Sequence, residues 1–317
     1  MTEFELIARF FSPLTTHTVL AGGDDAALVV VRPGMELVVS TDMLVGGRHF
    51  FADAQPYTVG WKALAVNLSD MAAMGAAPRW TTLSLALPGA DEGWLEAFAR
   101  GFLDLASRYD VDLIGGDTTR GPLNICVQIM GEAPGGKALR RSGARPGDEV
   151  WVSGTLGDAA FALAHHQGET QLATQDRDTV LARLNCPQPR VALGQALIGV
   201  ASSAIDVSDG LVADLGQLAQ RSSVKAVIEW ACVPLSHALR GASDSALVQR
   251  CALAGGDDYE LCFTAAPARR EFLVGAGARL GVPVTRIGRI EPGSGVAVLD
   301  ASGAHLEIER GGFDHFR

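Results

Sequence analysis

The pattern of apolar and polar residues predicts strands and helices that alternate along the whole chain. Two apolar segments, ALVVV (27–31) and ELVVST (36–41), are joined by Arg32-Pro33-Gly34, which predicts a β-hairpin. The next pattern predicts a long helix over about 56–75, because Pro56 fits the first turn of a helix, where its missing N–H is no loss. RWTTLSLAL (79–87) is then typical of a strand.

Apolar residues recur at helical spacing in the next segment and predict a helix with a core-facing stripe: Trp94, Leu95, Phe98, Phe102 and Leu105. Further strand patterns are VDLIGGD (111–117), LNICVQIM (123–130), EVWVSG (149–154), AIDVS (204–208), KAVIE (225–229), ELCFT (260–264) and VTRIGRI (284–290). Helical patterns cover 157–167, 188–200, 210–222 and 267–280. The alternation predicts a mixed α/β fold.

The chain is long enough for two domains, since a domain takes roughly 150 residues and the sequence has 317. The segment 131–149 is rich in glycine and proline and suits a junction. We therefore predict a boundary near 145, with domains at 1–145 and 146–317.

The composition is that of a compact protein, with 48% hydrophobic and 20% charged residues. No apolar run approaches the roughly 18–20 residues that cross a bilayer. The first residues, MTEFELIARFF, carry two glutamates where a signal peptide is basic, so we expect a cytoplasmic protein without a membrane segment. The five cysteines contain no C-x-x-C pair, which argues against a disulfide framework and a zinc ribbon.

The net charge of −10 is acidic, and no cluster of Lys and Arg indicates a nucleic-acid surface. A phosphorylated ligand would therefore need a few arginines or bound cations. Residues 131–137 fit G-x-x-x-x-G-K, but Ala138 stands where a hydroxyl should follow, so we reject a phosphate-binding loop. SGTLGDAA (153–160) is better explained as a glycine turn with a helix cap than as an anion site.

The tripeptide Gly-Gly-Asp occurs three times, at 22–24, 115–117 and 255–257, at unequal separations that argue against an internal repeat. Two copies continue with a second aspartate and no balancing basic residue. Two carboxylates about 4 Å apart repel by roughly 4 kcal/mol at an effective dielectric constant near 20. Divalent cations remove that repulsion, so the acids predict a metal site.

Several further aspartates follow apolar segments: Asp42, Asp70, Asp117, Asp206 and Asp209. Helical spacing places Asp70 on one stripe with Asn67 and Met74, in a largely apolar helix. A buried carboxylate needs a partner. Carboxylates next to the hydroxyls of Ser40 and Thr41 are hard oxygen ligands and favour Mg²⁺ shared with phosphates.

Seven segments, read in order, closely resemble the thiamine-monophosphate kinase family: GDDAA (23–27), STDMLVGGRHF (40–50), WKALAVNLSDMAAMGAAP (61–78), LIGGDTTRG (113–121), IDVSDGL (205–211), GGDDYELCFT (255–264) and GFDHF (312–316). The resemblance implies the α/β (α+β), two-domain fold of the aminoimidazole-ribonucleotide-synthetase-like superfamily. Its N-terminal domain would bind metal and ATP and dimerise through its sheet, and its C-terminal α/β domain would complete the active site.

The resemblance also implies a reaction and its partners. The reaction is the ATP-dependent phosphorylation of thiamine monophosphate to thiamine diphosphate, the last step of thiamine diphosphate biosynthesis. The expected partners are ATP as co-substrate, thiamine monophosphate, several Mg²⁺ ions and a second copy of the chain in a homodimer.

Site residues are implied by motif position. The Mg²⁺ ligands would be Asp25, Ser40, Thr41, Asp42, Asp70, Asp117, Asp206 and Asp209. ATP would be contacted by Gly116, Asp117, Arg141, Ser208 and Tyr109, and the thiamine substrate by His49, Asp257 and Phe313. Two positions depart from the family pattern, which usually has Glu in place of Asp257 and Trp or Tyr in place of Phe313.

Two alternatives stay open. One is another ATP-using enzyme of the superfamily, of the aminoimidazole ribonucleotide or selenophosphate synthetase type. Selenophosphate synthetases normally have a reactive Cys near the N-terminus, whereas the first cysteine of this sequence is Cys126. A non-catalytic acidic cation-binding module is the other, but the sequence contains no D-x-D-x-D-G calcium loop.

Overall fold

The computed structural model describes residues 3–308 and 311–313. The chain forms two compact units. Unit 1 comprises residues 1–71 and 76–136, and unit 2 comprises residues 72–75 and 137–317. The predicted boundary near 145 stays a prediction.

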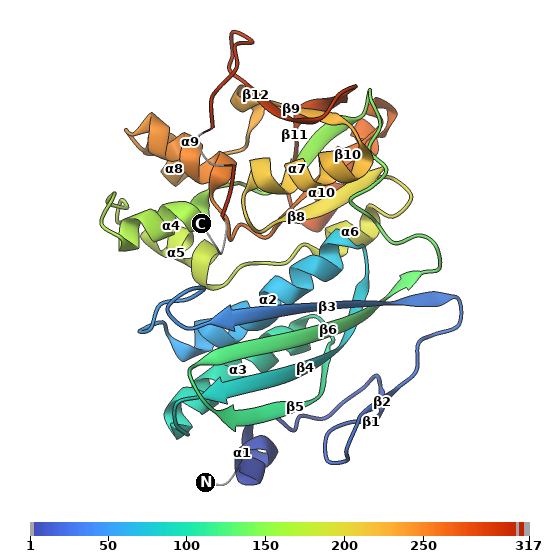
Figure 1. Ribbon diagram of the computed structural model, residues 1–317, viewed down its shortest axis with the longest axis vertical. Coiled ribbons are helices and arrows are strands. Elements are labelled where there is room, and N and C mark those ends of the chain that lie inside the picture. The colour runs from blue at the N-terminus through green and yellow to red at the C-terminus, as the bar shows by residue number, and fades with distance from the viewer. Residues whose placement is uncertain (1–2, 309–310, 314–317) are drawn as a thin grey trace. The chain divides into compact units, whose positions relative to one another are not determined.

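Unit 1 is a four-stranded sheet with helices on one face (Figure 1). Its elements are α1 (Glu3–Phe10), β1 (Thr18–Leu20), β2 (Leu28–Val29), β3 (Met35–Val45), α2 (Pro56–Ala73), β4 (Ala77–Leu87), α3 (Glu92–Arg108), β5 (Asp112–Arg120) and β6 (Asn124–Pro134). The strand order is β3-β6-β4-β5, with β4 and β5 parallel and the other pairs antiparallel. Helices α2 and α3 cover the same face of this sheet (Figure 1).

The predicted hairpin between 27–31 and 36–41 is wrong. β2 pairs with β1, and β3 pairs with β6 from Met35↔Pro134 to Val45↔Asn124. The turn residue Arg32 instead donates its N–H to Glu132 Oε1 of β6 at 2.7 Å. A ladder along the whole of β3 makes more hydrogen bonds than the short strand β2 can offer, so the long-range partner prevails.

Helices α2 and α3 touch through glycines. A Cβ atom on Gly60 would stand 2.0 Å from the carbonyl oxygen of Phe98, and one on Gly101 would stand 1.9 Å from that of Tyr57. The predicted stripe of α3 is buried at Leu95, Phe98, Phe102 and Leu105. The close approach lets these side chains reach the sheet.

Unit 2 is a six-stranded sheet of order β12-β9-β11-β7-β10-β8, in which only β12 and β9 run parallel. Its strands are β7 (Glu149–Ser153), β8 (Ser203–Val207), β9 (Lys225–Glu229), β10 (Glu260–Ala265), β11 (Val284–Glu291) and β12 (Gly295–Leu299). Its α-helices are α4 (Asp158–His166), α5 (Arg177–Asn185), α6 (Val191–Ala196), α7 (Leu211–Ser222), α8 (His237–Gly241), α9 (Ser245–Ala254) and α10 (Arg270–Leu280).

The pattern analysis found every strand of unit 2 except β12, and it missed α5, α8 and α9. The rejected phosphate-loop segment ends β6 and is followed by irregular chain up to β7, so no helix could present its N-terminus to phosphate there. In the part of the chain that the structure describes, no helix is long and apolar enough to cross a membrane.

We expect Gly101→Ala to lower the free energy of unfolding by about 3 kcal/mol or more, because the added methyl group meets the backbone of α2 and not a side chain that can move. Chemical denaturation measures the effect. Gly89→Ala is the matched control, since a Cβ there has no heavy atom within 4 Å and a change within about 0.5 kcal/mol is expected. Equal stability of the two variants would contradict the close packing.

Candidate active site

The helix-covered face of the sheet in unit 1 carries one group of predicted metal ligands. Side chains alternate along β3, so Ser40 and Asp42 share a face with the buried Val38 and Leu44. The hydroxyl of Ser40 donates a hydrogen bond to the carboxylate of Asp70 on α2. This contact brings together two residues that are far apart in the sequence.

Asn67 lies one helical turn before Asp70, and its side chain is fully buried. Its Nδ2 donates to the carbonyl of Ala63 at 3.0 Å, while its Oδ1 has no hydrogen-bond partner among the described residues. An unpaired buried oxygen on the same helix, one turn before a carboxylate that accepts from a hydroxyl, suits a hard cation such as Mg²⁺. The donor set on this face therefore fits the predicted metal.

Asp117 lies on the opposite face of the same sheet. Its register partner on β4 is Ser84, which pairs with Cys126 on β6, and Cys126 pairs with Met43 on β3. These side chains alternate with the residues that face the helices, so Asp117 points away from Asp42. β3 and β5 are also separated by β6 and β4, which places them roughly 14 Å apart.

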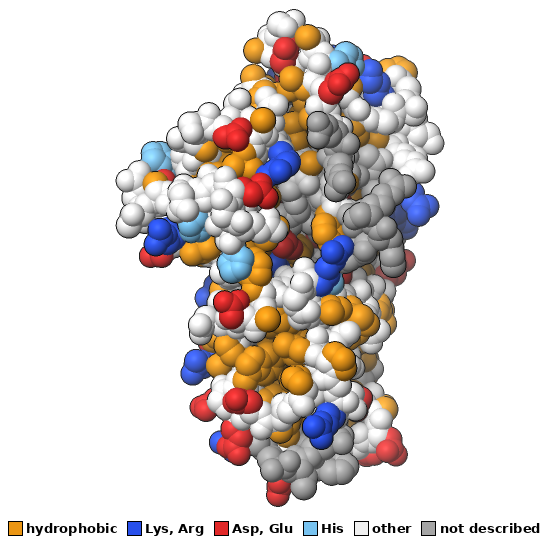
Figure 2. Space-filling model, turned by 60° about the vertical axis from the view of Figure 1, so that its left-hand side comes forward, with side chains coloured by type: hydrophobic (Ala, Val, Ile, Leu, Met, Phe, Trp, Pro, Cys, Tyr) orange, Lys and Arg blue, Asp and Glu red, His pale blue; other side chains and the backbone are white. Residues whose placement is uncertain are grey.

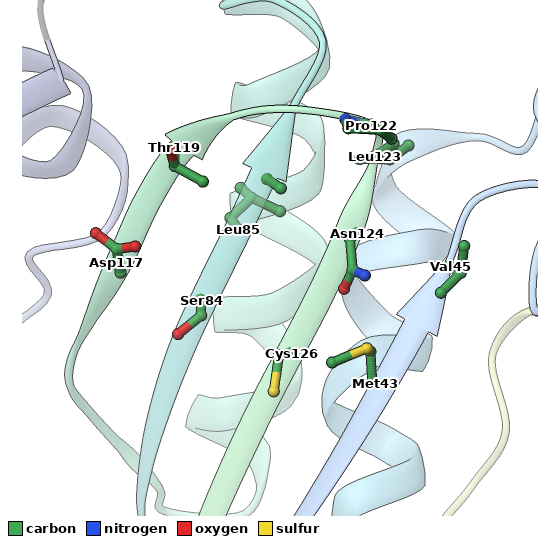
Figure 3. A pocket seen from close by; sticks show the side chains of 11 residues that line it. Met43, Val45, Ser84, Leu85, Asp117, Thr119, Pro122, Leu123, Asn124 and Cys126 are labelled. Carbon is green, nitrogen blue, oxygen red and sulfur yellow. The ribbon is translucent and has the colours of Figure 1, made fainter.

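A cavity of about 350 Å³ lies on this helix-free face (Figure 3). Its lining residues are Met43, Val45, Ser84, Leu85, Ala86, Asp117, Thr119, Pro122, Leu123, Asn124 and Cys126. The lining combines apolar side chains with the polar side chains of Ser84 on β4, Asn124 on β6, and Asp117 and Thr119 on β5 (Figure 3). A hollow with a single acidic side chain is not a metal site in itself.

No group of three or more His, Cys, Asp or Glu side chains that could hold a metal ion exists within residues 3–308 and 311–313. The prediction that all the acids form a single cradle therefore stays a prediction. Within unit 1 of one chain, the sheet separates Asp117 from Ser40 and Asp42.

His49 follows β3 in the loop that ends the strand. The backbone N–H of Val45 donates to its Nδ1 at 2.9 Å, so the neutral ring carries its proton on Nε2. Nε2–H is then the group that could donate to a phosphate. Tyr109 ends α3 and precedes β5, whereas Gly116 lies within β5.

Asp25 lies in the loop between β1 and β2, where its N–H donates to Asp24 Oδ1 at 2.9 Å. The chain just before this loop is fixed by Asp112, a buried residue at the start of β5. The carboxylate of Asp112 accepts hydrogen bonds from Thr16 N, Thr16 Oγ1, His17 N and Thr18 Oγ1. Burial alone would raise the pKa of Asp112, but these bonds outweigh it and lower the pKa below its ordinary value.

In unit 2, three segments meet at the end of β8 and bring together Ser208, Asp209, Asp257 and Phe313. The N–H of Asp257 donates to Ser208 O at 2.8 Å, and that of Phe313 donates to Asp209 O at 2.9 Å. Gly312 allows the second contact, because a Cβ there would stand 2.5 Å from Ala213 Cβ. Phe313 keeps 46% of its surface exposed. The rest of GFDHF, residues 314–316, lies outside the described residues.

Asp206 is buried in β8. Asp257 and Arg141 are two further predicted site residues of unit 2. Asp257 adopts φ +68° and accepts a hydrogen bond from Tyr259 Oη at 2.9 Å. Arg141 is exposed, and its carbonyl accepts a hydrogen bond from Ser222 Oγ of α7 at 2.9 Å.

Two acidic residues that the sequence analysis missed support this region. Asp214 Oδ2 accepts hydrogen bonds from the N–H groups of Ser208, Asp209 and Gly210 at 3.0, 3.0 and 3.1 Å. Burial, followed by repulsion from Asp206 and Asp209, raises the pKa of Asp214 to about 7. The sequence feature that could have identified Asp214 is its position four residues after Gly210, within the first turn of the helix predicted over 210–222.

The second missed residue is Glu260, which is fully buried at the start of β10. Arg190 donates to both of its oxygens at 2.7 and 2.5 Å, and Arg183 donates to Oε1 at 2.6 Å. Burial would raise the pKa of Glu260, but the two guanidinium groups lower it. Glu260 thereby fixes the chain directly after Tyr259.

Comparisons with known proteins agree with these motifs. Residues 23–133 match the family model "AIR synthase related protein, N-terminal domain", and residues 145–301 match "AIR synthase related protein, C-terminal domain". The thiamine-monophosphate kinase of Escherichia coli K12 is 46% identical over 99% of this chain and 98% of its own length. The chain belongs to the thiamine-monophosphate kinase family. The kinase of Bacillus subtilis is 36% identical over the full length of both chains.

Solved structures of the family share the fold. A thiamine-monophosphate kinase from Stenotrophomonas maltophilia superposes with a TM-score of 0.86 at 49% identity and covers 96% of both chains. AaThiL complexed with AMPPCP and TMP superposes with a TM-score of 0.77 at 33% identity, covering 90% of this chain and 89% of that chain. The hydrogenase maturation protein HypE, at 20% identity and a TM-score of 0.79, shares the fold alone. The predicted family and fold class are confirmed.

We expect Asp112→Asn to lower the free energy of unfolding by about 2–3 kcal/mol at pH 7, because charge-assisted hydrogen bonds to the segment 16–18 are lost. Since the folded-state pKa is lowered, this stabilisation is complete above the ordinary value of 3.8 and is lost as the pH falls through the folded-state pKa. Denaturation at several pH values should show the gap to the wild type closing below about pH 4.

Asp53 is exposed, so Asp53→Asn serves as the control for removing a charge from unit 1. Its free energy of unfolding should change by no more than about 0.5 kcal/mol. A gap for Asp112→Asn that is unchanged at pH 3 would show that the ionised carboxylate is not the source of the stabilisation.

Proposed function

We propose that this chain transfers the γ-phosphoryl group of ATP to the phosphate of thiamine monophosphate and releases ADP and thiamine diphosphate. The observation that carries the proposal is the 46% identity to the Escherichia coli kinase along 99% of the chain. The complex of AaThiL with AMPPCP, an analogue of ATP, and TMP supports a reaction between two substrates bound at the same time.

The reaction needs no covalent enzyme intermediate. The second pKa of a phosphate monoester is about 6, so the acceptor is mostly a dianion at neutral pH and is already nucleophilic. One of its oxygens forms a bond to the γ-phosphorus while the bond from that phosphorus to the β,γ-bridging oxygen breaks, and ADP leaves. We propose no catalytic base and no phosphoenzyme.

Repulsion between the two phosphates is the barrier that the protein must lower. Bound Mg²⁺ ions would neutralise phosphate charge and hold the γ-phosphoryl group in line. Ser40, Asp42 and Asp70 would hold such ions on unit 1 together with Asp25. The side chain of Thr41 alternates to the helix-free face of β3, so it would be a ligand on that side. Asp206 and Asp209 would hold them on unit 2. Arg141 is proposed to stabilise phosphate charge, and Gly116, Ser208 and Tyr109 to contact ATP.

The substrate side is proposed to consist of His49, Asp257 and Phe313. His49 would donate from Nε2, since Nδ1 already accepts from Val45 N. The carboxylate of Asp257 would attract the positively charged thiazolium ring. Phe313 would face the same ring, with a weaker cation–π attraction than Trp would give.

We propose that two chains pair through the helix-free face of the sheet in unit 1. This face exposes Leu37, Val39, Met43 and Val45 along β3. Figure 2 shows hydrophobic side chains gathered in a patch on the surface of unit 1. A second copy is the occupant that would cover apolar residues on an otherwise acidic protein.

Such a dimer would also solve the separation of the acids. One chain holds Asp117 on the face opposite Asp42, so the two cannot ligate one ion within a chain. Because Asp42 faces the helices, a ligand from the partner can reach it only around the edge of the sheet, and β3 and β5 are the two edge strands. We propose that the β3 edge of one protomer lies beside the β5 edge of the other, so that each active site combines Asp42 of one protomer with Asp117 of the partner subunit. The site is then incomplete in a monomer.

We expect the purified protein, incubated with Mg²⁺, ATP and thiamine monophosphate, to form ADP and thiamine diphosphate in equal amounts, because each transfer yields one of each. Separation of the products by chromatography measures both. Omitting thiamine monophosphate should abolish ADP formation. ADP without thiamine diphosphate would favour an alternative synthetase-type reaction and contradict the kinase.

We expect Asp42→Asn and Asp117→Asn each to lower kcat by about hundredfold or more. Mixed dimers of the two variants, purified through two different tags, should recover about half of the wild-type rate, because one of their two sites holds both native aspartates. Dimers of wild type with Asp42→Asn are the control, with about half activity under either arrangement. Inactive mixed dimers of the two variants would contradict the shared site but would leave the proposed kinase reaction unaffected.

A further inference from the structure

We propose, on the basis of the phosphoryl-transfer function above, that Asp214 is a positioning residue for the active site. Its carboxylate would set the direction of the loop Ser208-Asp209-Gly210, and through this loop the placement of Asp257 and Phe313. Asp214 itself would touch neither substrate nor metal.

The geometry of the loop supports this role. One oxygen of Asp214 accepts three consecutive backbone N–H groups, those of Ser208, Asp209 and Gly210. Only 4% of Asp214 is exposed. Three successive N–H groups that converge on one oxygen define the path of the chain between β8 and α7. The orientation of the Asp209 side chain follows from that path.

The other side of the loop carries the substrate residues. Because the N–H groups turn inward to Asp214, the carbonyl groups of Ser208 and Asp209 are available to other segments. Ser208 O accepts from Asp257 N, and Asp209 O accepts from Phe313 N. A change at Asp214 would therefore reach both substrate-binding segments through two hydrogen bonds in series.

Helix capping alone does not account for this residue. Helices are usually capped by a side chain that precedes the first turn, as Asp244 does for α9 by accepting from Ala246 N and Leu247 N. Asp214 lies inside α7 and accepts from the N–H of the N-cap residue Gly210, as in a capping box, but it also accepts from Asp209 N and Ser208 N, which precede the cap.

The test compares Asp214→Ala, which removes the acceptor, with Asp214→Asn, which keeps an acceptor oxygen. Asp214→Ala should lower kcat by about 10–100-fold and raise the KM for thiamine monophosphate, because the loop loses its direction. Asp214→Asn should restore both values to within about threefold of the wild type. Asp244→Ala, the matched control, should lower thermal stability but leave kcat and KM unchanged.

Hydrogen exchange gives a second readout that does not depend on activity. The amides of residues 208–210 should exchange slowly in the wild type, although they lie in a loop. They should exchange at least about tenfold faster in Asp214→Ala and at a near-native rate in Asp214→Asn. If Asp214→Ala does not fold, the exchange rates of these amides in the wild type and in Asp214→Asn still test the proposal.

Fast exchange of these amides in the wild type, or kinetics of Asp214→Ala that match those of Asp244→Ala, would overturn the proposal. An Asp214→Asn variant as inactive as Asp214→Ala would also overturn it, since charge and not the acceptor would then matter. A wild type that forms no thiamine diphosphate would instead refute the proposed function, and slow exchange would still show that Asp214 fixes the loop.

Discussion

Hydrogen bonds from backbone N–H groups to buried carboxylates fix the loops on which the candidate site depends. Asp112 holds residues 16–18 before the Asp24-Asp25 loop, and Asp214 holds residues 208–210. Asp258, between Asp257 and Tyr259, accepts from Gly157 N with both of its oxygens. A carboxylate can accept several N–H groups at once, so one acidic side chain fixes a loop that a hydroxyl would hold at a single point.

The proposed metal site draws on other acids of the same chain. Alternation along β3 turns Ser40 and Asp42 toward Asp70, while the register of β5 turns Asp117 to the other face. A flat sheet cannot bring both sets to one ion, because each side chain is committed to a face by its position in the strand. Pairing of two sheets would reunite them where the edge strand β3 of one chain meets the edge strand β5 of the other, because Asp42 does not lie on the paired face. The function would then require the dimer, and the apolar face would serve catalysis as well as assembly.

The sequence predicts those parts of the structure that depend on local patterns. The helix over 56–75 and the stripe of α3 follow from spacing and burial. Asp70 and Asp209 are predicted as site residues because they follow recognisable apolar segments, and these roles stay predictions. The partner of β3 could not be found in this way, because pairing with β6 depends on contacts far along the chain. The face on which Asp117 lies depends on the same register. Asp214 and Glu260 look like ordinary acids of a helix and a strand until their partners are known.

Position 257, where the resemblance to the family leads us to expect Glu, has a backbone conformation that suits Asp. Residue 257 adopts φ +68°, a left-handed conformation that Asp tolerates better than longer side chains do. Tyr259 adopts φ +50°, where an aromatic residue is strained, and its N–H donates to Val207 O at 2.8 Å. Its hydroxyl donates to Asp257 Oδ1 and holds the shorter carboxylate in place. Asp at this position therefore loses reach by one methylene but fits its backbone with less strain, and a water molecule can bridge the remaining distance to a substrate.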